Sequence, residues 1–474
     1  MFCGFRFRVC MVENSEESIG YPQRRRSAGV ETLIGTLELI VTALILAFVF
    51  RAYVVEAFRI PTGSMADTLR GSHYHLRCVR CGFEYNVGGD TYGAPQPQCP
   101  SCGYNHPAGM GISVSNGDRI LVLKCLYMFT DPKRWDVIVF KNPVNPQESY
   151  IKRCVAGPGE TLEIVDGDIV VDGQIARKPP RVQEELWMTI YNNDYQMLRQ
   201  GRLMPGEDAD DERDAASWRQ PFANDPNSRW DLNAHGPTVF ALKGDPDKIH
   251  RLTYNSSAVN DFRASYAYND SNGRNGMPFC SDLMVRFDVR PTGRHGRIGV
   301  ELTKYGVAYR GSVDFQGVLR LEKIVDGRAV ELEKRAIEMP RTDRAQRFRF
   351  ANADHVLVLE FGDEKLRHDL GAGPYDIGDK SKRGAPAVGI FGAGEMRLWH
   401  IGIFRDIHYT SRRILRAKEG EPFRLGPDEF FACGDNSPIS LDSRMWAGEG
   451  IGNGTKTYTK GICLLYTSDA ADEL

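Results

Sequence analysis

An apolar stretch near the N-terminus stands apart from the pattern of the rest of the chain. Eighteen residues, Leu33 to Phe50, are apolar except at Gly35, Thr36, Glu38 and Thr42. At about 1.5 Å of rise per residue, a helix of this length reaches roughly 27 Å, near the hydrocarbon thickness of a bilayer. The pattern predicts a transmembrane helix within residues 30–55.

A basic cluster, Arg24 to Arg26, precedes this stretch. The positive-inside rule places such a cluster in the cytoplasm, so residues 1–29 are expected there and everything after Arg51 on the far side. A cleaved signal peptide is the competing interpretation, but the stretch is longer than a typical signal-peptide core and no A-x-A-like site follows it. A buried core helix is a further alternative.

The second half of the chain has the alternation of β-strands. Val285, Phe287 and Val289 alternate with charged residues, as do Leu319 and Leu321. Residues 355–361 and 396–409 predict two more strands, with Gly and Pro between the runs. An antiparallel β-sandwich is therefore expected at about residues 225–412, and its last strand loosely resembles that of jelly rolls of the laminin-G or concanavalin kind.

Composition narrows the class of protein. The 474 residues are 42% hydrophobic and 26% charged, which is typical of a folded chain of two or three domains. A mean hydropathy of −0.38 excludes a polytopic membrane protein. Sixty basic residues against 62 acidic ones give a net charge of −2, so no nucleic-acid partner is expected.

Four of the eleven cysteines form two C-x2-C pairs, Cys78 with Cys81 and Cys99 with Cys102. Gly82 and Gly103 directly follow the second Cys of each pair. Four thiolates at this spacing are typical of a closed, structural Zn²⁺ site in a zinc ribbon, here expected at residues 76–105. Two disulfides are the alternative, and the expected far side of the membrane favours them more than the cytosol would.

Four ordered segments carry candidate chemistry after the apolar stretch. They are Glu56 to Leu69 with Ser64 in a Pro-Thr-Gly-Ser-Met turn, Gly117-Asp118-Arg119, Arg134 to Glu160 with Lys152, and Gly434 to Arg444. Taken alone, a serine in a turn is usually only a turn residue, and a lysine on a strand is usually solvated. In this order, and behind a membrane anchor, the segments resemble type I signal peptidase over roughly residues 30–175 and 425–446.

The resemblance implies a Ser-Lys dyad, with Ser64 as nucleophile and Lys152 as general base. Thr62, where family members often carry Ser, matches the hydroxyl that completes the oxyanion hole with the Ser64 N–H. Ser440 matches the residue that hydrogen-bonds the lysine amine, while Asp442 and Arg444 match a supporting charged pair. Asp435 and Asn436 are expected to shape their own turn.

The resemblance also implies the organisation of a mainly β chain. The catalytic fold of the family would be interrupted by the ribbon and by a large insertion that folds as its own unit. The expected parts are 1–29, cytoplasmic; 30–55, anchor; 56–181, first catalytic part with the ribbon at 76–105; 182–415, insertion with the sandwich at about 225–412; 416–462, last catalytic part; and 463–474, a tail that resembles an adapter-derived sequence.

Function follows from the same resemblance. The chain is expected to be a single-pass protein of the bacterial inner membrane that cleaves exported preproteins on the periplasmic side, without a catalytic cofactor and with a structural zinc. Its expected partners are signal peptides, the lipid bilayer and the secretion translocon. The alternative is a non-catalytic, membrane-tethered binding protein whose sandwich binds carbohydrate or protein, and the simplest role of the sandwich is that of a spacer.

Overall fold

The computed structural model describes most of the chain in two compact units, residues 1–56 and 57–474. The residues described are 28–89, 97–106, 113–142, 145, 147–195, 220–234, 236, 238–257, 260–269, 276–339, 344–373, 385–410, 414–446, 450–451 and 457–458. The basic cluster Arg24–Arg26 and the tail 463–474 lie outside the described residues.

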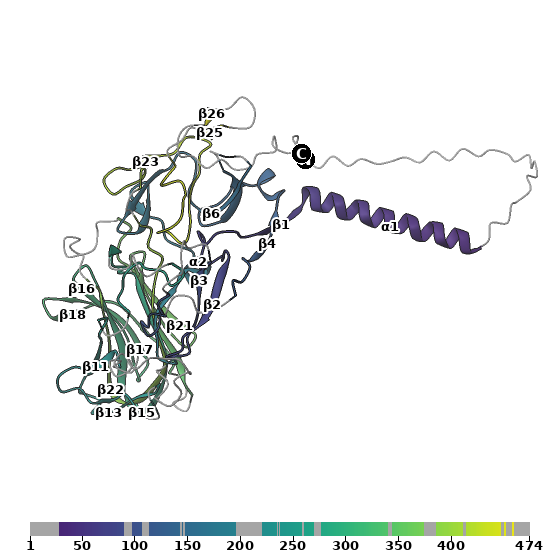
Figure 1. The fold of residues 1–474 in the computed structure, drawn as a ribbon. Helices are drawn as coiled ribbons and strands as arrows, with labels where there is room; N and C mark the ends of the chain where they lie inside the picture. Colours follow the sequence, from purple (N-terminus) through teal and green to yellow (C-terminus); the bar gives the residue numbers. More distant parts are fainter. Residues whose placement is uncertain are drawn as a thin grey trace, which may run out of the picture. The chain divides into compact units, whose positions relative to one another are not determined.

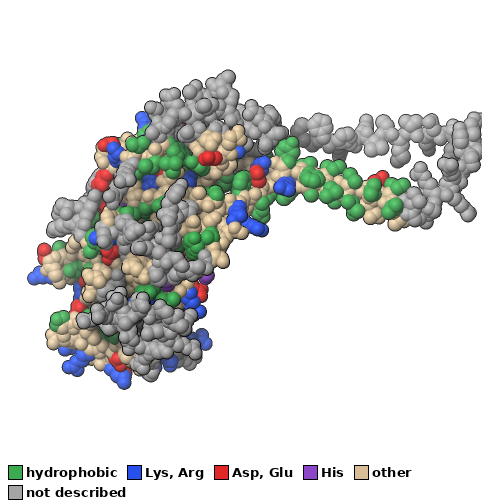
Figure 2. Space-filling view, viewed as in Figure 1, with side chains coloured by type: hydrophobic (Ala, Val, Ile, Leu, Met, Phe, Trp, Pro, Cys, Tyr) green, Lys and Arg blue, Asp and Glu red, His purple; other side chains and the backbone are tan. Residues whose placement is uncertain are grey.

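The described part of the first unit, residues 28–56, forms one helix, α1 (Ala28–Tyr53). Its segment Thr32–Tyr53 is long and apolar enough to cross a membrane, and none of it is buried by protein. Figure 2 shows hydrophobic side chains over the length of this helix. The helix confirms the predicted apolar element and ends at Tyr53.

The second unit holds the predicted catalytic parts, which are built from short strands. Their elements are β1 (Val55–Arg59), β2 (His73–Arg77), β3 (Glu84–Gly88), β4 (Arg119–Leu123), η1 (Leu126–Met128), β5 (Val137–Lys141), β6 (Ser149–Ala156), β7 (Thr161–Val165), β8 (Asp168–Val171), β9 (Gln174–Ile175), β23 (Phe423–Arg424), β24 (Phe431–Cys433), β25 (Gly450–Ile451) and β26 (Thr457–Tyr458).

Two small antiparallel sheets organise this part. One has the order β24-β6-β5 and the other β23-β7-β8-β9, so both join residues before the insertion to residues after it. Their apolar faces pack into common clusters, one of which includes Val155, Leu162 and Phe431, all 0% exposed. This packing brings the segment around residue 435 against strand β6.

Among its described residues, the insertion has one helix and thirteen strands, and the strands form a single antiparallel sheet. The elements are α2 (Pro180–Leu186), β10 (Met188–Asn192), β11 (Phe222–Asn224), β12 (Trp230–Asp231), β13 (Phe240–Lys243), β14 (His250–Tyr254), β15 (Leu283–Lys304), β16 (Val307–Asp314), β17 (Val318–Val325), β18 (Arg328–Ala336), β19 (Gln346–Ala353), β20 (Val356–Phe361), β21 (Glu364–Asp369) and β22 (Ala387–Arg405). Figure 1 shows β11, β13, β15 and β22 grouped together.

Two long strands, β15 and β22, organise this sheet. β15 pairs with β19 over its first half and with β16 over its second half, and it pairs with β22 along most of its length. The register shifts between Pro291 and Gly296, where the pairing partner changes. Such an irregularity lets one strand bend from one face of a core to the other.

The predicted alternation is confirmed in these strands. Val285, Phe287 and Val289 of β15 and Leu319 and Leu321 of β17 are all 0% exposed and belong to one hydrophobic core. The strand predicted at 396–409 begins earlier, at Ala387, and ends earlier, at Arg405. Beyond it the chain leaves the sheet, because Tyr409 N–H donates to the carbonyl of Gly167 instead.

A buried charged cluster joins the insertion to the first catalytic part. Lys178 Nζ lies 2.5 Å from Asp354 Oδ1 and 3.0 Å from Asp406 Oδ2. Lys304 pairs with Asp282, and the Asp168 carboxyl lies beside Asp282 and Asp354. Burial raises the pKa of Asp168 well above its usual range. Because buried charges need their partners, these pairs tie the insertion to the first catalytic part within the second unit.

Candidate active site

The Ser64 turn follows strand β1 and is fixed by its neighbours on both sides of the serine. Gly63 and Met65 are buried, whereas Ser64 is half-buried and Thr62 is exposed. Ala66 N–H donates to the carbonyl of Gly63 over 3.0 Å. Met65 is 0% exposed and so anchors the turn in the core while the Ser64 hydroxyl stays accessible.

Lys152 lies in the middle of β6, the central strand of its three-stranded sheet. Its side chain is buried at 4% exposure. Nζ donates a hydrogen bond to Ser64 Oγ over 2.8 Å and another to the carbonyl of Ile151 over 3.1 Å. The structure thus brings together two predicted site residues that are 88 positions apart in the chain, within the distance that proton transfer requires.

Arg153, the next residue on β6, points to the opposite face and forms a buried ion pair. Its guanidinium lies 2.6 Å from Asp435 Oδ2, and the two side chains are 1% and 0% exposed. Asp435 also accepts a hydrogen bond from Thr68 Oγ1 over 2.7 Å. Strand β6 therefore presents the Lys152 amine on one face. On its other face, Arg153 binds Asp435 and so holds the segment Gly434 to Arg444.

Asn436 contacts the backbone of the Ser64 turn rather than its own turn alone. Its N–H donates to the carbonyl of Ser64 over 3.0 Å, and its Nδ2 donates to the carbonyl of Gly63 over 3.0 Å. Neither this role of Asn436 nor the role of Arg153 was predicted from the sequence. The polar pair Asp435 and Asn436 is visible in the sequence, but the residues that these two side chains contact, Arg153 and Gly63, lie far away in the chain.

The three supporting residues predicted in the last segment lie close to one another. Arg444 donates to both carboxylate oxygens of Asp442, over 2.8 and 2.7 Å. Burial alone would raise the pKa of Asp442, but the Arg444 guanidinium and the Gly434 N–H hold it below its usual range. Arg444 also donates to the Thr410 carbonyl, so the pair ties the last segment to the end of the insertion.

Ser440 lies in the same segment as the supporting pair. Its hydroxyl is buried and helps to lower the pKa of Asp442, while its predicted bond to the Lys152 amine stays a prediction. The hydroxyl packs against Gly434, where a side-chain Cβ would overlap it and the carbonyl of Ser64. Its observed position is therefore beside the Ser64 turn.

The four predicted cysteines converge at the start of the second unit. Their sulfur atoms all lie within 4.8 Å of one another, and the Cys78–Cys102 and Cys81–Cys99 separations are each 3.6 Å. All four are free thiols, since a disulfide needs about 2.05 Å. Gly82 and Gly103 adopt positive φ and donate to the carbonyls of Cys78 and Cys99, which closes the two turns. This set could hold a metal ion.

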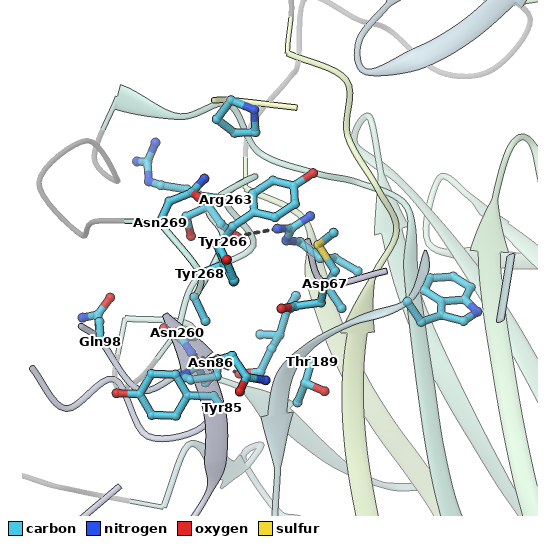
Figure 3. Close-up of a pocket in the computed structure, with 18 of the residues that line it drawn as sticks. Asp67, Tyr85, Asn86, Gln98, Thr189, Asn260, Arg263, Tyr266, Tyr268 and Asn269 are labelled. Atoms are coloured by element: carbon cyan, nitrogen blue, oxygen red, sulfur yellow. Dashed lines mark hydrogen bonds between the residues drawn. The ribbon is translucent and has the colours of Figure 1, made fainter. Parts of the chain in front are cut away.

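A cavity of about 850 Å³ lies behind the Ser64 turn. It is lined by Asp67 and Pro438 from the catalytic parts, by ribbon residues such as Asn86, and by insertion residues such as Tyr268. Figure 3 shows Tyr266, Tyr268 and Asn269 grouped on one side of it. Neither Ser64 nor Lys152 lines this cavity, so it is separate from the reacting groups.

Comparisons with known proteins identify the segment around Lys152. The family model described as signal peptidase, peptidase S26, matches residues 104–214. Signal peptidase I of Rickettsia typhi is 27% identical over 127 residues, which are 27% of this chain and 39% of that protein. The Pseudomonas aeruginosa protein of the same name is 29% identical over 143 residues, which are 29% of this chain and 39% of that protein.

A shorter match with a higher identity is found in Signal peptidase I of Aquifex aeolicus, which is 46% identical over 56 residues, 12% of this chain and 22% of that protein. The chain therefore aligns with about two-fifths or less of the length of these relatives. Among solved structures, carbohydrate-binding module CBM66 from Bacillus subtilis matches 39% of this chain and 92% of its own, with 13% identity and a TM-score of 0.22.

Proposed function

The chain belongs to the type I signal peptidase family through residues 104–214, and from this premise we propose that it is a membrane-anchored serine endopeptidase that removes signal peptides from exported preproteins. The observation that carries the proposal is the 2.8 Å hydrogen bond from Lys152 Nζ to Ser64 Oγ. The same contact argues against the alternative of a non-catalytic binding protein, because an exposed binding module needs no buried amine against a hydroxyl.

The proposed reaction proceeds through an acyl-enzyme. Ser64 Oγ attacks the scissile carbonyl while Lys152 Nζ accepts the hydroxyl proton. The tetrahedral intermediate then collapses: the C–N bond breaks, and Lys152 returns the proton to the leaving amine. A water molecule, deprotonated by Lys152, attacks the Ser64 ester. As the acyl C–Oγ bond breaks, Lys152 returns that proton to Ser64 Oγ and the signal peptide is released with a free carboxyl group. No cofactor takes part in these steps.

The base must be neutral to accept a proton. A solvated lysine has a pKa near 10.4 and is protonated at neutral pH, whereas burial disfavours the charged form. The 4% exposure of Lys152 and its position in a strand interior support this requirement, because burial favours the neutral amine. Cleavage is therefore expected to rise with pH as the amine loses its proton.

The oxyanion is assigned to Thr62 and the Ser64 N–H. Both belong to the turn that Met65 and Asn436 hold in place, so the donors are fixed before the substrate arrives. Such preorganised donors stabilise the developing charge without reorganisation during the reaction. Ser440, Asp442 and Arg444 are assigned to support this turn and the last segment.

We further propose that Cys78, Cys81, Cys99 and Cys102 hold one structural Zn²⁺. A tetrahedral zinc with Zn–S distances of about 2.3 Å places its sulfur atoms about 3.8 Å apart, which suits the observed 3.6 Å. Four protein ligands leave no position for water, so the ion would stabilise the ribbon and take no part in catalysis.

Elemental analysis of the purified protein should therefore find about one zinc per chain. Cys99→Ser should lose the zinc and lower the unfolding temperature, because the remaining thiolates cannot close the tetrahedron. Cys125→Ser, which changes a cysteine outside the cluster, is the matched control and should keep the metal. Equal zinc in both variants, or four thiols that are unreactive until reduced, would contradict the zinc assignment.

The proposed location is the bacterial inner membrane, with α1 as the anchor and the second unit on the periplasmic side. The signal peptidase relatives and the apolar helix support this location, and preproteins leaving the translocon would meet the enzyme there.

The turn at Asp326 and Gly327 between β17 and β18 is exposed, so a protease site can be introduced there to test the orientation. Protease added to intact spheroplasts should cut that site. A cut only after lysis would reverse the orientation.

A further inference from the structure

A short segment of the insertion, residues 266–269, lies against the Ser64 turn and the last catalytic segment. Tyr266 OH donates to the carbonyl of Asp435 over 2.9 Å. Tyr268 OH donates to the carbonyl of Ser72 over 3.0 Å, and the Tyr268 carbonyl accepts from the N–H of Gly88 at the end of β3. The segment therefore touches the ribbon and both parts of the catalytic fold.

The Tyr268 ring packs directly on Gly63, the residue before Ser64. A Cβ at position 63 would overlap the ring, so the glycine permits an approach that no other residue allows. Tyr268 itself is 0% exposed. The position of the Ser64 turn is thus coupled to a residue that is more than 200 positions away and belongs to the insertion.

Asn269 makes the most specific contact of the segment. Its Nδ2 donates to Asn436 Oδ1 over 2.7 Å, and Asn436 Nδ2 donates back to Asn269 Oδ1 over 2.7 Å. The second hydrogen of Asn436 Nδ2 is directed at the carbonyl of Gly63. The Gly63 carbonyl accepts only from an N–H and therefore selects the orientation in which Asn436 Nδ2 faces the Ser64 turn. The reciprocal pair with Asn269 satisfies the other N–H and the Oδ1 of the Asn436 amide, and so holds the amide in that orientation.

The Gly63 carbonyl and the Ser64 N–H belong to the same planar peptide group. In a trans peptide they point in opposite directions, so a hydrogen bond that holds the carbonyl also sets the direction of the N–H. Asn436 additionally holds the next carbonyl, that of Ser64. Asn436 therefore holds both the peptide that offers the oxyanion donor and the peptide that follows it.

We propose that Asn269 is a positioning residue of the active site: it orients the Asn436 amide, which fixes the Gly63–Ser64 peptide and aims the Ser64 N–H at the oxyanion. This inference rests on the proposed peptidase function. It makes the insertion a part of the catalytic apparatus, since one of its side chains acts on the donor through a single intermediate residue.

The test uses the full chain in detergent with a model preprotein. Asn269→Ala should lower kcat roughly 10- to 100-fold, less than the roughly 10²- to 10³-fold cost of removing an oxyanion donor itself. KM should change by less than about twofold, because the donor acts in the transition state. The matched control is Asn233→Ala, an exposed asparagine of the same insertion, which should leave kcat unchanged.

A double-mutant cycle separates positioning from general stability. In an Asn436→Ala background, Asn269→Ala should cost less than about twofold in kcat, because its route to the donor is already lost. Equal losses in both backgrounds, or a loss of kcat explained by a lowered unfolding temperature, would overturn the inference. If the wild type cleaves and Ser64→Ala does not, an unaffected Asn269→Ala refutes this inference alone. A wild type without Ser64-dependent cleavage refutes the proposed function.

Discussion

Lys152→Ala and Ser64→Ala should each reduce preprotein cleavage on the order of 10⁴-fold or more, because the two residues act as one unit and neither works without the other. Lys152→Arg should not restore activity, since a guanidinium stays protonated and cannot accept the hydroxyl proton. The measurement is single-turnover cleavage of a model preprotein across pH. For the wild type, the rate should rise with pH as the amine becomes neutral.

A lysine on the neighbouring strand provides the control for this experiment. Lys141 of β5 lies in the same sheet as Lys152 and pairs in register with Ser149. Lys141→Ala should change the rate less than about twofold, since surface charges away from the reacting atoms contribute little. If Lys152→Ala kept more than about a tenth of the wild-type rate while Ser64→Ala was inactive, another residue would have to be the base.

The second large effect concerns the stability of the fold around the site. Asp435→Ala should destabilise the protein by about 3–5 kcal/mol, because it leaves the Arg153 guanidinium buried without its partner. Replacing both members, as in Arg153→Met with Asp435→Leu, should recover much of this loss, since no unpaired charge remains. Denaturant unfolding of the second unit, followed by tryptophan fluorescence, measures the free energy.

An exposed pair of the same chemistry is the matched control. Arg177 pairs with Asp369, whose side chain is 47% exposed. Hydrogen bonding to Arg177 lowers the pKa of Asp369, but an exposed pair contributes only about 0–1 kcal/mol. Asp369→Ala should therefore have little effect. Similar losses for Asp435→Ala and Asp369→Ala would show that burial of the Arg153 pair is not what stabilises this region.

Local patterns in the sequence predicted the features that depend on neighbouring residues. The apolar run predicted α1, and the period-two alternation predicted β15 and β17 with their buried faces. The spacing of the cysteines and their following glycines predicted two turns that bring the thiols together. These predictions succeeded because helix length, strand alternation and tight turns are governed by interactions within a few residues.

Only the tertiary structure decided which remote side chains meet. A one-residue slip of β6 would exchange the faces of Lys152 and Arg153, so the contact with Ser64 depends on the register between β5, β6 and β24. The ordered segments in the sequence predicted Ser64 and Lys152 as candidates. They did not reveal that Arg153 pairs with Asp435, 282 positions away, or that Ser440 packs on Gly434.

The insertion shows most clearly the difference between what local patterns predict and what the tertiary structure decides. Its strands were predictable from alternation, but its contacts with the catalytic fold were not. Tyr268 on Gly63 and Asn269 on Asn436 arise from packing between segments that no periodicity connects. The buried pairs of Lys178 and Lys304 likewise require carboxylates from distant strands. The sequence by itself therefore determined the elements and the candidate chemistry, while long-range packing and burial decided that the insertion, the ribbon and the Ser64 turn are built as one unit.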